Sequence, residues 1–264
     1  MFYLIGIGLK PAHLTIEALN KIKECEVIYL ETYTCLYAEG TVQDLEKIIG
    51  KKIIPLNRTQ VEENFVEQNL KLAKERNIAL LVFGNALTAT THTQLLVDCK
   101  KQGIKFEVFA GISVTDFLGK TGLNIYKFGR SVTLVLPEKN YEPESFYDQI
   151  LKNQEQELHT LCFLDIKEGN RLMTVKEGIQ VLEKIETKRE QKILNQITFI
   201  GLSKAGSQDE KIMWGNLEEM KQAKLDTPAF LVVCSKLSDF EKEALEKLFN
   251  KPTLGTIFKG WTGK

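Results

Sequence analysis

The chain has 264 residues, more than one compact domain usually contains, and 43% of them are hydrophobic, enough to build a core in each of two domains. Its 35 basic residues balance 35 acidic ones, which argues against nucleic acid or an anionic membrane as the main partner. Residues 1–9 are apolar but lack the basic segment and cleavage site of a signal peptide, and no apolar stretch of about 18 residues follows, so we expect neither secretion nor a membrane span.

The cysteines are scattered singly, without the paired spacing of a zinc site or a redox motif. They are Cys25, Cys35, Cys99, Cys162 and Cys234. Reduced thiols are typical of a cytosolic protein. The sequence therefore predicts a cytoplasmic location and no metal site.

In the first half of the chain, short apolar segments alternate with amphipathic ones. Strands are expected at 2–8, 27–30, 52–55, 79–84 and 105–110, and helices at 15–24, 41–49, 60–76 and 89–102. The strand segments are apolar almost throughout, which is typical of strands that are covered on both faces. The alternation of strand and helix predicts an α/β fold with an open, mainly parallel sheet.

The pattern changes after the glycine-containing stretch 120–130. Strand-like segments follow at 131–137, 160–166, 197–203, 211–215 and 229–235. Only three convincing helices separate them. We place a domain boundary near 122–128, which predicts an N-terminal α/β domain at 1–124 and a C-terminal α/β domain at 125–250. The last stretch, 251–264, has lost its periodicity and is expected to be a tail.

The first expected strand ends in a glycine turn, Gly6-Ile7-Gly8-Leu9, and Thr15 is placed to cap the helix that follows. Ligands of open α/β sheets bind at the carboxyl ends of the strands. A nicotinamide-binding interpretation is supported by Glu31, about 20 residues further on, where a ribose-binding acid would lie. Pro11, however, occupies the position of that motif's third glycine.

A second turn, 82–92, follows the fourth expected strand and carries many hydroxyl side chains in front of the next helix. Its backbone N–H groups and side-chain oxygens are suited to holding a ligand. The alternative is a purely structural role, in which Thr88, Thr90 or Thr91 caps the first amides of the helix. His92 is expected to pack against its neighbours and not to act in catalysis.

A third turn, 109–114, contains Gly111, and it again follows a strand and opens a helix. Because the carboxyl ends of parallel strands meet at one edge of a sheet, we expect the three glycine turns to converge. Three convergent turns indicate a ligand site more strongly than any one of them does.

Six segments together resemble the diphthine synthases, a group within the tetrapyrrole-methylase-like family. They are YLIGIGL (3–9), VFGNALTATTH (82–92), TGLNIYKFG (121–129), CFLDIKEGNRLMTV (162–175), SKAGSQDEKIMWGNLEE (203–219) and SKLSDFEKEALEKL (235–248). They occur in the family's order and spacing over about residues 1–249. The LDIK and AGS-x-D segments distinguish this group from the corrin and sirohaem methylases.

The resemblance implies an S-adenosylmethionine-dependent methyltransferase, normally a homodimer, with two α/β domains. The N-terminal sheet would be mainly parallel, the C-terminal sheet mixed, and the cofactor held in the cleft between the domains. It further implies a protein substrate, translation elongation factor 2, and S-adenosylhomocysteine as a product. In this family the factor's modified histidine carries a 3-amino-3-carboxypropyl group, whose amine is methylated to give diphthine in diphthamide biosynthesis.

Eight positions match cofactor-contacting positions of the family. They are Leu9, Asn85, Thr88, Ser113 and Val114 in the first half, and Leu164, Ser203 and Ala229 in the second. No residue is assigned as a general base, since methyl transfer from an activated sulfonium depends mainly on positioning and water exclusion. Asp165, Lys167 and Asp209 lie close to these segments and are interpreted as solvated surface charges.

The chain departs from the family at three of its motif positions. The family usually has Gly-Asp-Pro where this chain has Gly84-Asn85-Ala86, and usually has His where this chain has Ala229. Asparagine lacks the charge that strengthens a hydrogen bond from a hydroxyl donor, which predicts cofactor binding weaker by roughly 1–2 kcal/mol. The departures leave open an alternative, a divergent member that binds the elongation factor or the cofactor with little or no turnover.

Overall fold

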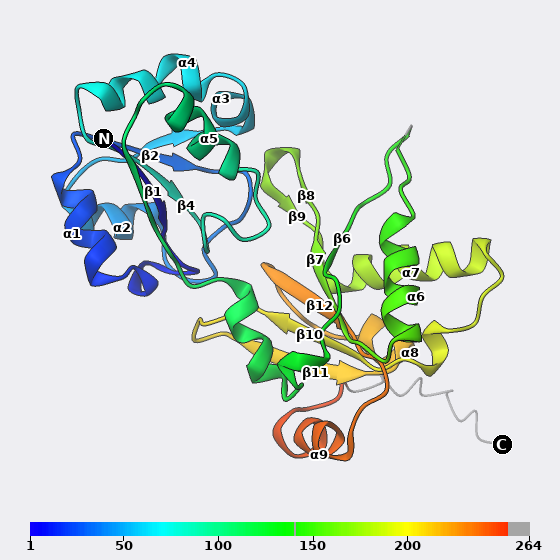
Figure 1. Ribbon diagram of the computed structural model, residues 1–264. Coiled ribbons are helices and arrows are strands. Elements are labelled where there is room, and N and C mark those ends of the chain that lie inside the picture. Colours follow the sequence, from blue (N-terminus) through cyan, green and yellow to red (C-terminus); the bar gives the residue numbers. More distant parts are fainter. Residues whose placement is uncertain (140, 253–264) are drawn as a thin grey trace, which may run out of the picture. The chain divides into compact units, whose positions relative to one another are not determined.

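A computed structural model describes residues 1–139 and 141–252 (Figure 1). The chain divides into two compact units. The N-terminal unit comprises Met1–Leu118, Ile166–Leu172 and Lys204–Glu210, and the C-terminal unit comprises Gly119–Asp165, Met173–Ser203 and the described residues from Lys211 onward. The predicted limits, 1–124 and 125–250, differ from this division, because they assign Ile166–Leu172 and Lys204–Glu210 to the second domain. From residue 253 on, the predicted tail lies outside the described residues.

The N-terminal unit contains a five-stranded sheet in the order β3-β2-β4-β1-β5. Its strands are β1 (Phe2–Gly6), β2 (Val27–Glu31), β3 (Ile54–Leu56), β4 (Ile78–Val82) and β5 (Phe106–Phe109). Every neighbouring pair is parallel. The predicted open parallel sheet is therefore confirmed.

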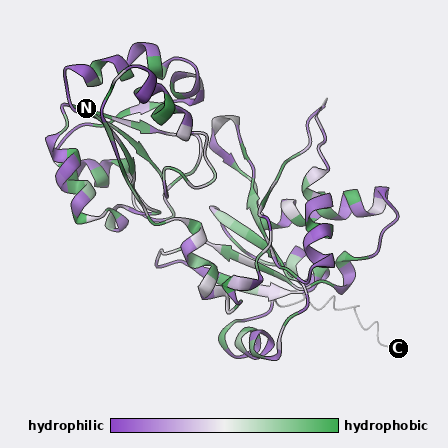
Figure 2. Ribbon diagram, in the orientation of Figure 1, coloured by the Kyte–Doolittle hydropathy of each residue, from purple (hydrophilic) through white to green (hydrophobic). Residues whose placement is uncertain are grey.

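Helices cover both faces of this sheet. One face packs against α1 (Ile16–Glu24) and α2 (Val42–Ile49), and the other against α3 (Arg58–Glu62), α4 (Phe65–Gln68), η2 (Leu70–Lys74) and α5 (Thr93–Lys101). Successive side chains of β1 alternate between the two cores, with Leu4 in one and Ile5 in the other. This double burial explains why the strand segments are apolar almost throughout, as the hydropathy colouring of Figure 2 shows.

The predicted helix at 60–76 is wrong as one continuous element. The structure divides this segment into α3, α4 and η2, which are separated at Asn64 and Asn69. Asparagine side chains compete with helical hydrogen bonding and favour such breaks. The apolar positions that suggested a helix, including Val61 and Phe65, are nevertheless buried in the core. The periodicity thus identified the buried face but not the breaks.

The C-terminal unit contains a second five-stranded sheet, in the order β11-β10-β12-β7-β6. Its strands are β6 (Val132–Leu134), β7 (Thr160–Leu164), β10 (Phe199–Ser203), β11 (Lys211–Gly215) and β12 (Ala229–Val233). Only β6 and β7 pair in parallel, and the other neighbours are antiparallel. The predicted mixed sheet is confirmed.

The core of the C-terminal unit lies between this sheet and three helices. They are α6 (Ser145–Glu155), α7 (Val175–Lys188) and α8 (Leu217–Lys221). The remaining elements are the final helix α9 (Asp239–Leu248), the hairpin of β8 (Ile166–Lys167) and β9 (Arg171–Leu172), and the 3₁₀ turns η1 (Pro11–His13), η3 (Val114–Thr121), η4 (Ile125–Lys127), η5 (Glu168–Asn170) and η6 (Leu194–Gln196).

Within residues 1–139 and 141–252, no helix has the length and apolar composition needed to cross a membrane.

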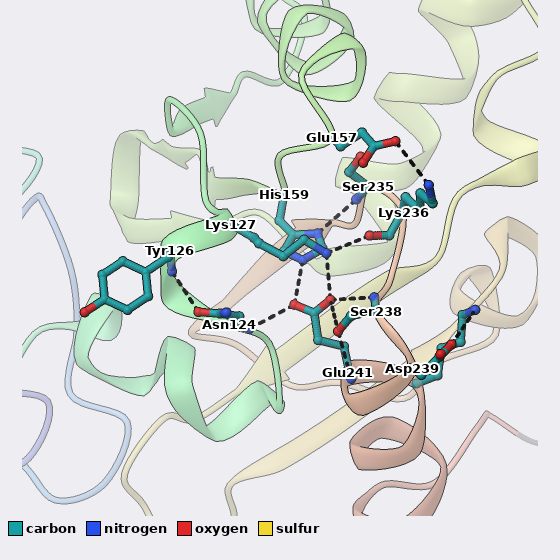
Figure 3. Close-up of polar contacts among 11 residues, drawn as sticks. Asn124, Tyr126, Lys127, Glu157, His159, Ser235, Lys236, Ser238, Asp239 and Glu241 are labelled. Carbon is teal, nitrogen blue, oxygen red and sulfur yellow. Dashed lines mark hydrogen bonds and ion pairs between the residues drawn. The ribbon is translucent and has the colours of Figure 1, made fainter.

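A buried carboxylate ties α9 to two other segments of the C-terminal unit and to its own N-cap (Figure 3). Glu241 is fully buried and accepts hydrogen bonds from Lys127 Nζ at 2.8 Å and from His159 Nε2 at 3.1 Å. It also accepts from the backbone amides of Asn124, at 3.0 Å, and Ser238, at 2.8 Å. Each oxygen of the carboxylate thus accepts two of these hydrogen bonds, which offsets the cost of burying its charge.

Candidate functional site

The three glycine turns meet at the carboxyl ends of β1, β4 and β5. Gly8 and Gly84 exchange two backbone hydrogen bonds, of 3.0 and 2.9 Å. A Cβ atom added to Gly6 would lie 2.6 Å from the backbone nitrogen of Gly111 and 2.7 Å from the carbonyl oxygen of Gly84. Such contacts leave no room for a side chain. The convergence expected from the sequence is therefore observed, and glycine is what permits it.

The strand connections also diverge at this place. The chain leaves β1 for α1 on one face of the sheet, and it leaves the neighbouring β4 for α5 on the opposite face. In open parallel sheets, ligands bind where neighbouring connections separate in this way. The carboxyl ends of β1 and β4 thus form the switch point of the N-terminal sheet.

The first turn is anchored through His13. Leu9 is 3% exposed, and its amide donates to Nδ1 of His13 at 3.3 Å. The His13 ring stacks on Phe117, with centroids 6.3 Å apart, and its Cε1 lies 2.6 Å from where a Cβ on Gly206 would be. The segment 204–210 therefore packs beside the first turn within the N-terminal unit. No local sequence pattern indicated this role of His13.

The helix after the first turn begins as predicted. The hydroxyl of Thr15 accepts a hydrogen bond from the amide of Ala18 at 3.1 Å, which caps α1. The third turn is capped in a similar way: the Ser113 amide donates to the Asp116 carboxylate at 2.7 Å, and the Ser113 hydroxyl accepts from the Thr115 amide at 3.3 Å. The element that follows, η3, is a 3₁₀ helix that begins at Val114.

The second turn is built on Asn85. Its Oδ1 accepts from the Leu87 amide at 3.0 Å, and its carbonyl oxygen accepts from the Thr88 amide at 3.2 Å. Asn85 and Thr88 are both partly buried. In the described part of the chain, Nδ2 of Asn85 donates to no protein acceptor. The side chain thus shapes the turn with its oxygen and leaves its amide group available to a ligand.

The capping alternative for this turn is wrong. The N-cap of α5 is His92, which makes no side-chain capping hydrogen bond. The hydroxyl of Thr90 donates to the carbonyl oxygen of Ala86 at 2.6 Å and so closes the turn on itself. The predicted helix at 89–102 correspondingly begins later, at Thr93.

The three candidate residues of the C-terminal unit lie at one end of its sheet. Ser203 ends β10 and is paired in register with Ala229, which begins β12. Phe230 of β12 is paired with Phe163 of β7, so the next position along β7 is Leu164. Ser203 is 1% exposed, and its Oγ has no hydrogen-bond partner within the described residues. A buried hydroxyl without a protein partner is suited to receive a ligand.

Glu31 is not available for the ribose that a nicotinamide-binding site would require. Its side chain is fully buried, and its Oε1 accepts hydrogen bonds from the amides of Tyr33 at 3.0 Å and Thr34 at 2.7 Å. These bonds hold the loop after β2. Together with Pro11 in place of a motif glycine, they argue against the nicotinamide interpretation.

The acidic residues near the motifs are held by protein partners. The Asp165 carboxylate accepts from the Leu136 amide at 3.0 Å, and the exposed Asp209 lies 3.5 Å from Lys204 Nζ. Neither geometry identifies a general base. Over residues 1–139 and 141–252, no group of three or more His, Cys, Asp or Glu side chains is placed to hold a metal ion.

Residues 1–221 match the family of tetrapyrrole (corrin/porphyrin) methylases. The chain is 35% identical over 254 residues to the diphthine synthase of Methanocaldococcus jannaschii, covering 94% of this chain and 98% of that protein. The diphthine synthase of Methanococcus aeolicus is 35% identical over 252 residues, with coverage of 94% and 98%.

A solved structure resembles the whole fold. The crystal structure of a candidate diphthine synthase from Entamoeba histolytica superposes with a TM-score of 0.85 at 31% identity, covering 96% of this chain and 99% of that one. A second diphthine synthase crystal structure gives a TM-score of 0.85 at 27% identity, covering 94% and 96%. The similarity in fold therefore extends over both units.

Proposed function

Because this chain belongs to the tetrapyrrole (corrin/porphyrin) methylase family, in its diphthine synthase group, we propose that it methylates translation elongation factor 2 in diphthamide biosynthesis. The chain is a methyltransferase. Its acceptor would be the amine of the 3-amino-3-carboxypropyl group on the factor's modified histidine, and the product would be diphthine. The observation that carries the proposal is the convergence of three glycine turns at the switch point of the parallel sheet.

We propose S-adenosylmethionine as the methyl donor, because the residues present fit such a ligand. Gly6 and Gly111 let the three turns pack backbone against backbone at the strand ends, and Gly84, with φ of 72°, permits the sharp turn. Asn85 Nδ2 and Ser203 Oγ are polar atoms without protein partners in the described chain. The residues that would hold the cofactor are Leu9, Asn85, Thr88, Ser113, Val114, Leu164, Ser203 and Ala229.

The chemistry of methyl transfer makes modest demands on the protein. S-Adenosylmethionine supplies a methyl group already activated by its sulfonium. The residues of this chain would then fix the acceptor amine in line and exclude water, which can supply much of the rate. S-Adenosylhomocysteine would be the second product, and a homodimer the working form. Light scattering coupled to gel filtration tests the dimer, since a monomer mass would contradict it.

Replacing Asn85 by aspartate should strengthen cofactor binding. Aspartate has nearly the same shape, so one carboxylate oxygen would keep the hydrogen bond from the Leu87 amide. The other would replace Nδ2, which can only donate, by a charged acceptor for a ligand hydroxyl. We expect Asn85→Asp to lower the dissociation constant of S-adenosylmethionine about tenfold, measured by isothermal titration calorimetry.

Asn216→Asp is the matched control for this prediction. Asn216 also accepts from a backbone amide, that of Glu219, but it caps α8 on the exposed surface. Asn216→Asp should leave the affinity for S-adenosylmethionine unchanged. Equal affinities of the wild type and Asn85→Asp would contradict the role assigned to Asn85.

The same titrations test the cofactor class and separate the active enzyme from the binding-only alternative. Binding of S-adenosylmethionine and S-adenosylhomocysteine by the wild type supports the proposal. Binding that appears only in Asn85→Asp would indicate a member that has lost its activity. No binding by either protein would contradict the cofactor assignment. The match over 94% of the chain favours the active enzyme.

A further inference from the structure

A buried histidine holds the second turn at its backbone. The carbonyl oxygen of Ala86 accepts from Thr90 Oγ1 at 2.6 Å and lies 3.0 Å from Nδ1 of His92. A carbonyl oxygen can only accept a hydrogen bond, so Nδ1 of His92 must carry a proton. His92 is 2% exposed and Ala86 is fully buried, which leaves these groups to satisfy each other. The imidazole thus fixes the backbone one residue beyond Asn85.

The other ring nitrogen faces a carboxylate. Nε2 of His92 lies 3.5 Å from Oε2 of Glu31, at the end of β2, and forms no closer hydrogen bond in the described chain. Both side chains are buried, at 2% and 0% exposure. The ring thus lies between the Ala86 carbonyl on one side and the end of β2 on the other.

Glu31 is itself fixed by the loop that follows β2. The amides of Tyr33 and Thr34 both donate to its Oε1, and the Thr34 hydroxyl donates to its Oε2 at 2.7 Å, so the carboxylate is held in a fixed orientation beside His92. Because β2 and β4 are neighbours in the sheet, the contact joins the loop after β2 to the turn after β4. The chain has Ala86 where the family usually has proline, so these hydrogen bonds supply order that a proline ring would otherwise provide.

We propose that His92, which donates from Nδ1 to the Ala86 carbonyl and packs against Glu31, is the positioning residue of the cofactor turn. This inference rests on the proposed function, because the turn it positions is the one assigned to the cofactor. As a positioning residue, His92 would touch neither substrate nor cofactor. It acts by holding the Ala86 carbonyl and, through it, the orientation of Asn85.

The hydrogen bond from Nδ1 of His92 can be tested directly by ¹⁵N NMR of histidine-labelled protein. The chain has three histidines, and in the other two Nδ1 accepts a hydrogen bond, from the Leu9 amide in His13 and from the Ser235 amide in His159. We expect Nδ1 of His92 to carry a proton, with its signals assigned by their loss in His92→Asn. An Nδ1 without a proton in wild-type His92 would overturn the proposal.

Calorimetric titration of S-adenosylmethionine tests the positioning role. His92→Ala removes both contacts and should weaken binding about tenfold. His92→Asn places an amide nitrogen near the position of Nδ1 and should recover most of that loss, whereas a purely space-filling role predicts no recovery. Thr93→Ala, at an exposed neighbouring position, should bind like the wild type. Equal binding by His92→Ala and the wild type, or no recovery in His92→Asn, would overturn the proposal.

The two readouts separate this inference from the proposed function. If the wild type binds no S-adenosylmethionine, the cofactor assignment fails, and with it the positioning role. The NMR measurement still decides whether Nδ1 of His92 donates to the Ala86 carbonyl, because it needs no ligand. Circular dichroism of each variant shows whether it is folded before its affinity is compared.

Discussion

Gly111→Ala should abolish detectable binding of S-adenosylmethionine and lower the free energy of unfolding by about 2–3 kcal/mol. The added Cβ would lie 2.5 Å from the carbonyl carbon of Gly6 and closer still to the carbonyl oxygen of Gly84. Both obstacles are backbone atoms, so no side-chain rotation can relieve the clash. The three turns would have to separate, and the backbone groups that approach the ligand would move with them.

Calorimetry and urea denaturation measure the two effects, with Gly119→Ala as the matched control. A Cβ on Gly119 meets nothing within 4 Å, and its φ lies outside the left-handed region. This substitution should therefore leave affinity unchanged. Normal cofactor affinity in Gly111→Ala would show that the convergence of the glycine turns is not the basis of the site.

Glu241→Ala should destabilise the protein by about 3–5 kcal/mol, because it removes one partner of a buried charge network. Lys127 and His159 would lose their shared acceptor, and the amides of Asn124 and Ser238 would lose theirs (Figure 3). Urea denaturation at pH 7 measures this loss in the free energy of unfolding. Glu246→Ala, on the exposed side of the same helix, is the control and should change stability little. A loss no larger than that of the control would refute the network's role.

The same network makes stability depend on pH. Burial tends to raise the pKa of Glu241, but hydrogen bonds from Lys127, Asn124, Ser238 and His159 outweigh it, and the pKa is lowered below the ordinary value of about 4.3. The folded state therefore binds a proton less readily than the unfolded state. The stabilisation from Glu241 is present in full above the ordinary pKa and is lost as pH falls toward the lowered one.

His159 contributes in the same direction. Burial lowers its pKa, although Glu241 opposes the shift, and its Nδ1 already accepts from the Ser235 amide. Below about pH 6.5, His159 therefore binds a proton more readily in the unfolded chain than in the folded chain. The free energy of unfolding again falls as the pH is lowered. The free energy of unfolding, measured from about pH 7 to about pH 3, should decline steadily. The difference in this free energy between the wild type and Glu241→Ala should narrow below about pH 4, and a constant difference would contradict the assignment.

The sequence predicted the parts of the fold that depend on local pattern. Apolar strands in alternation with amphipathic segments indicated a doubly covered parallel sheet, and the glycines at three strand ends indicated where the chain turns sharply. Thr15 as a helix cap followed from its position before an amphipathic run. In each case the physical cause lies within a few residues of the element it determines.

The contacts that the sequence did not predict are non-local. The amide of Gln208 donates to Glu39 at 2.7 Å, which helps to place 204–210 in the N-terminal unit, and no pattern in either segment indicates it. The pairing of Glu241 with His159 joins residues distant in the chain. His92 and Glu31 were considered separately, as a packed residue and a ribose-binding acid, because only the sheet order brings them together.

Strand register explains why three of the predicted cofactor residues could be grouped only with the fold in hand. Ser203, Ala229 and Leu164 come from β10, β12 and β7, whose order in the sheet differs from their order in the sequence. Strand pairing depends on long-range packing and not on local propensity. Their assignment as cofactor contacts stays a prediction that the binding experiments test.

The central claim is methyl transfer to elongation factor 2, and mass spectrometry of the factor tests it most directly. Factor carrying the 3-amino-3-carboxypropyl histidine would be incubated with this protein and S-adenosylmethionine bearing a labelled methyl group. We predict labelled methyl groups on the amine of that one residue, and none when Gly111→Ala replaces the wild type. An unmodified histidine derivative after incubation with wild-type protein that binds the cofactor would contradict the claim.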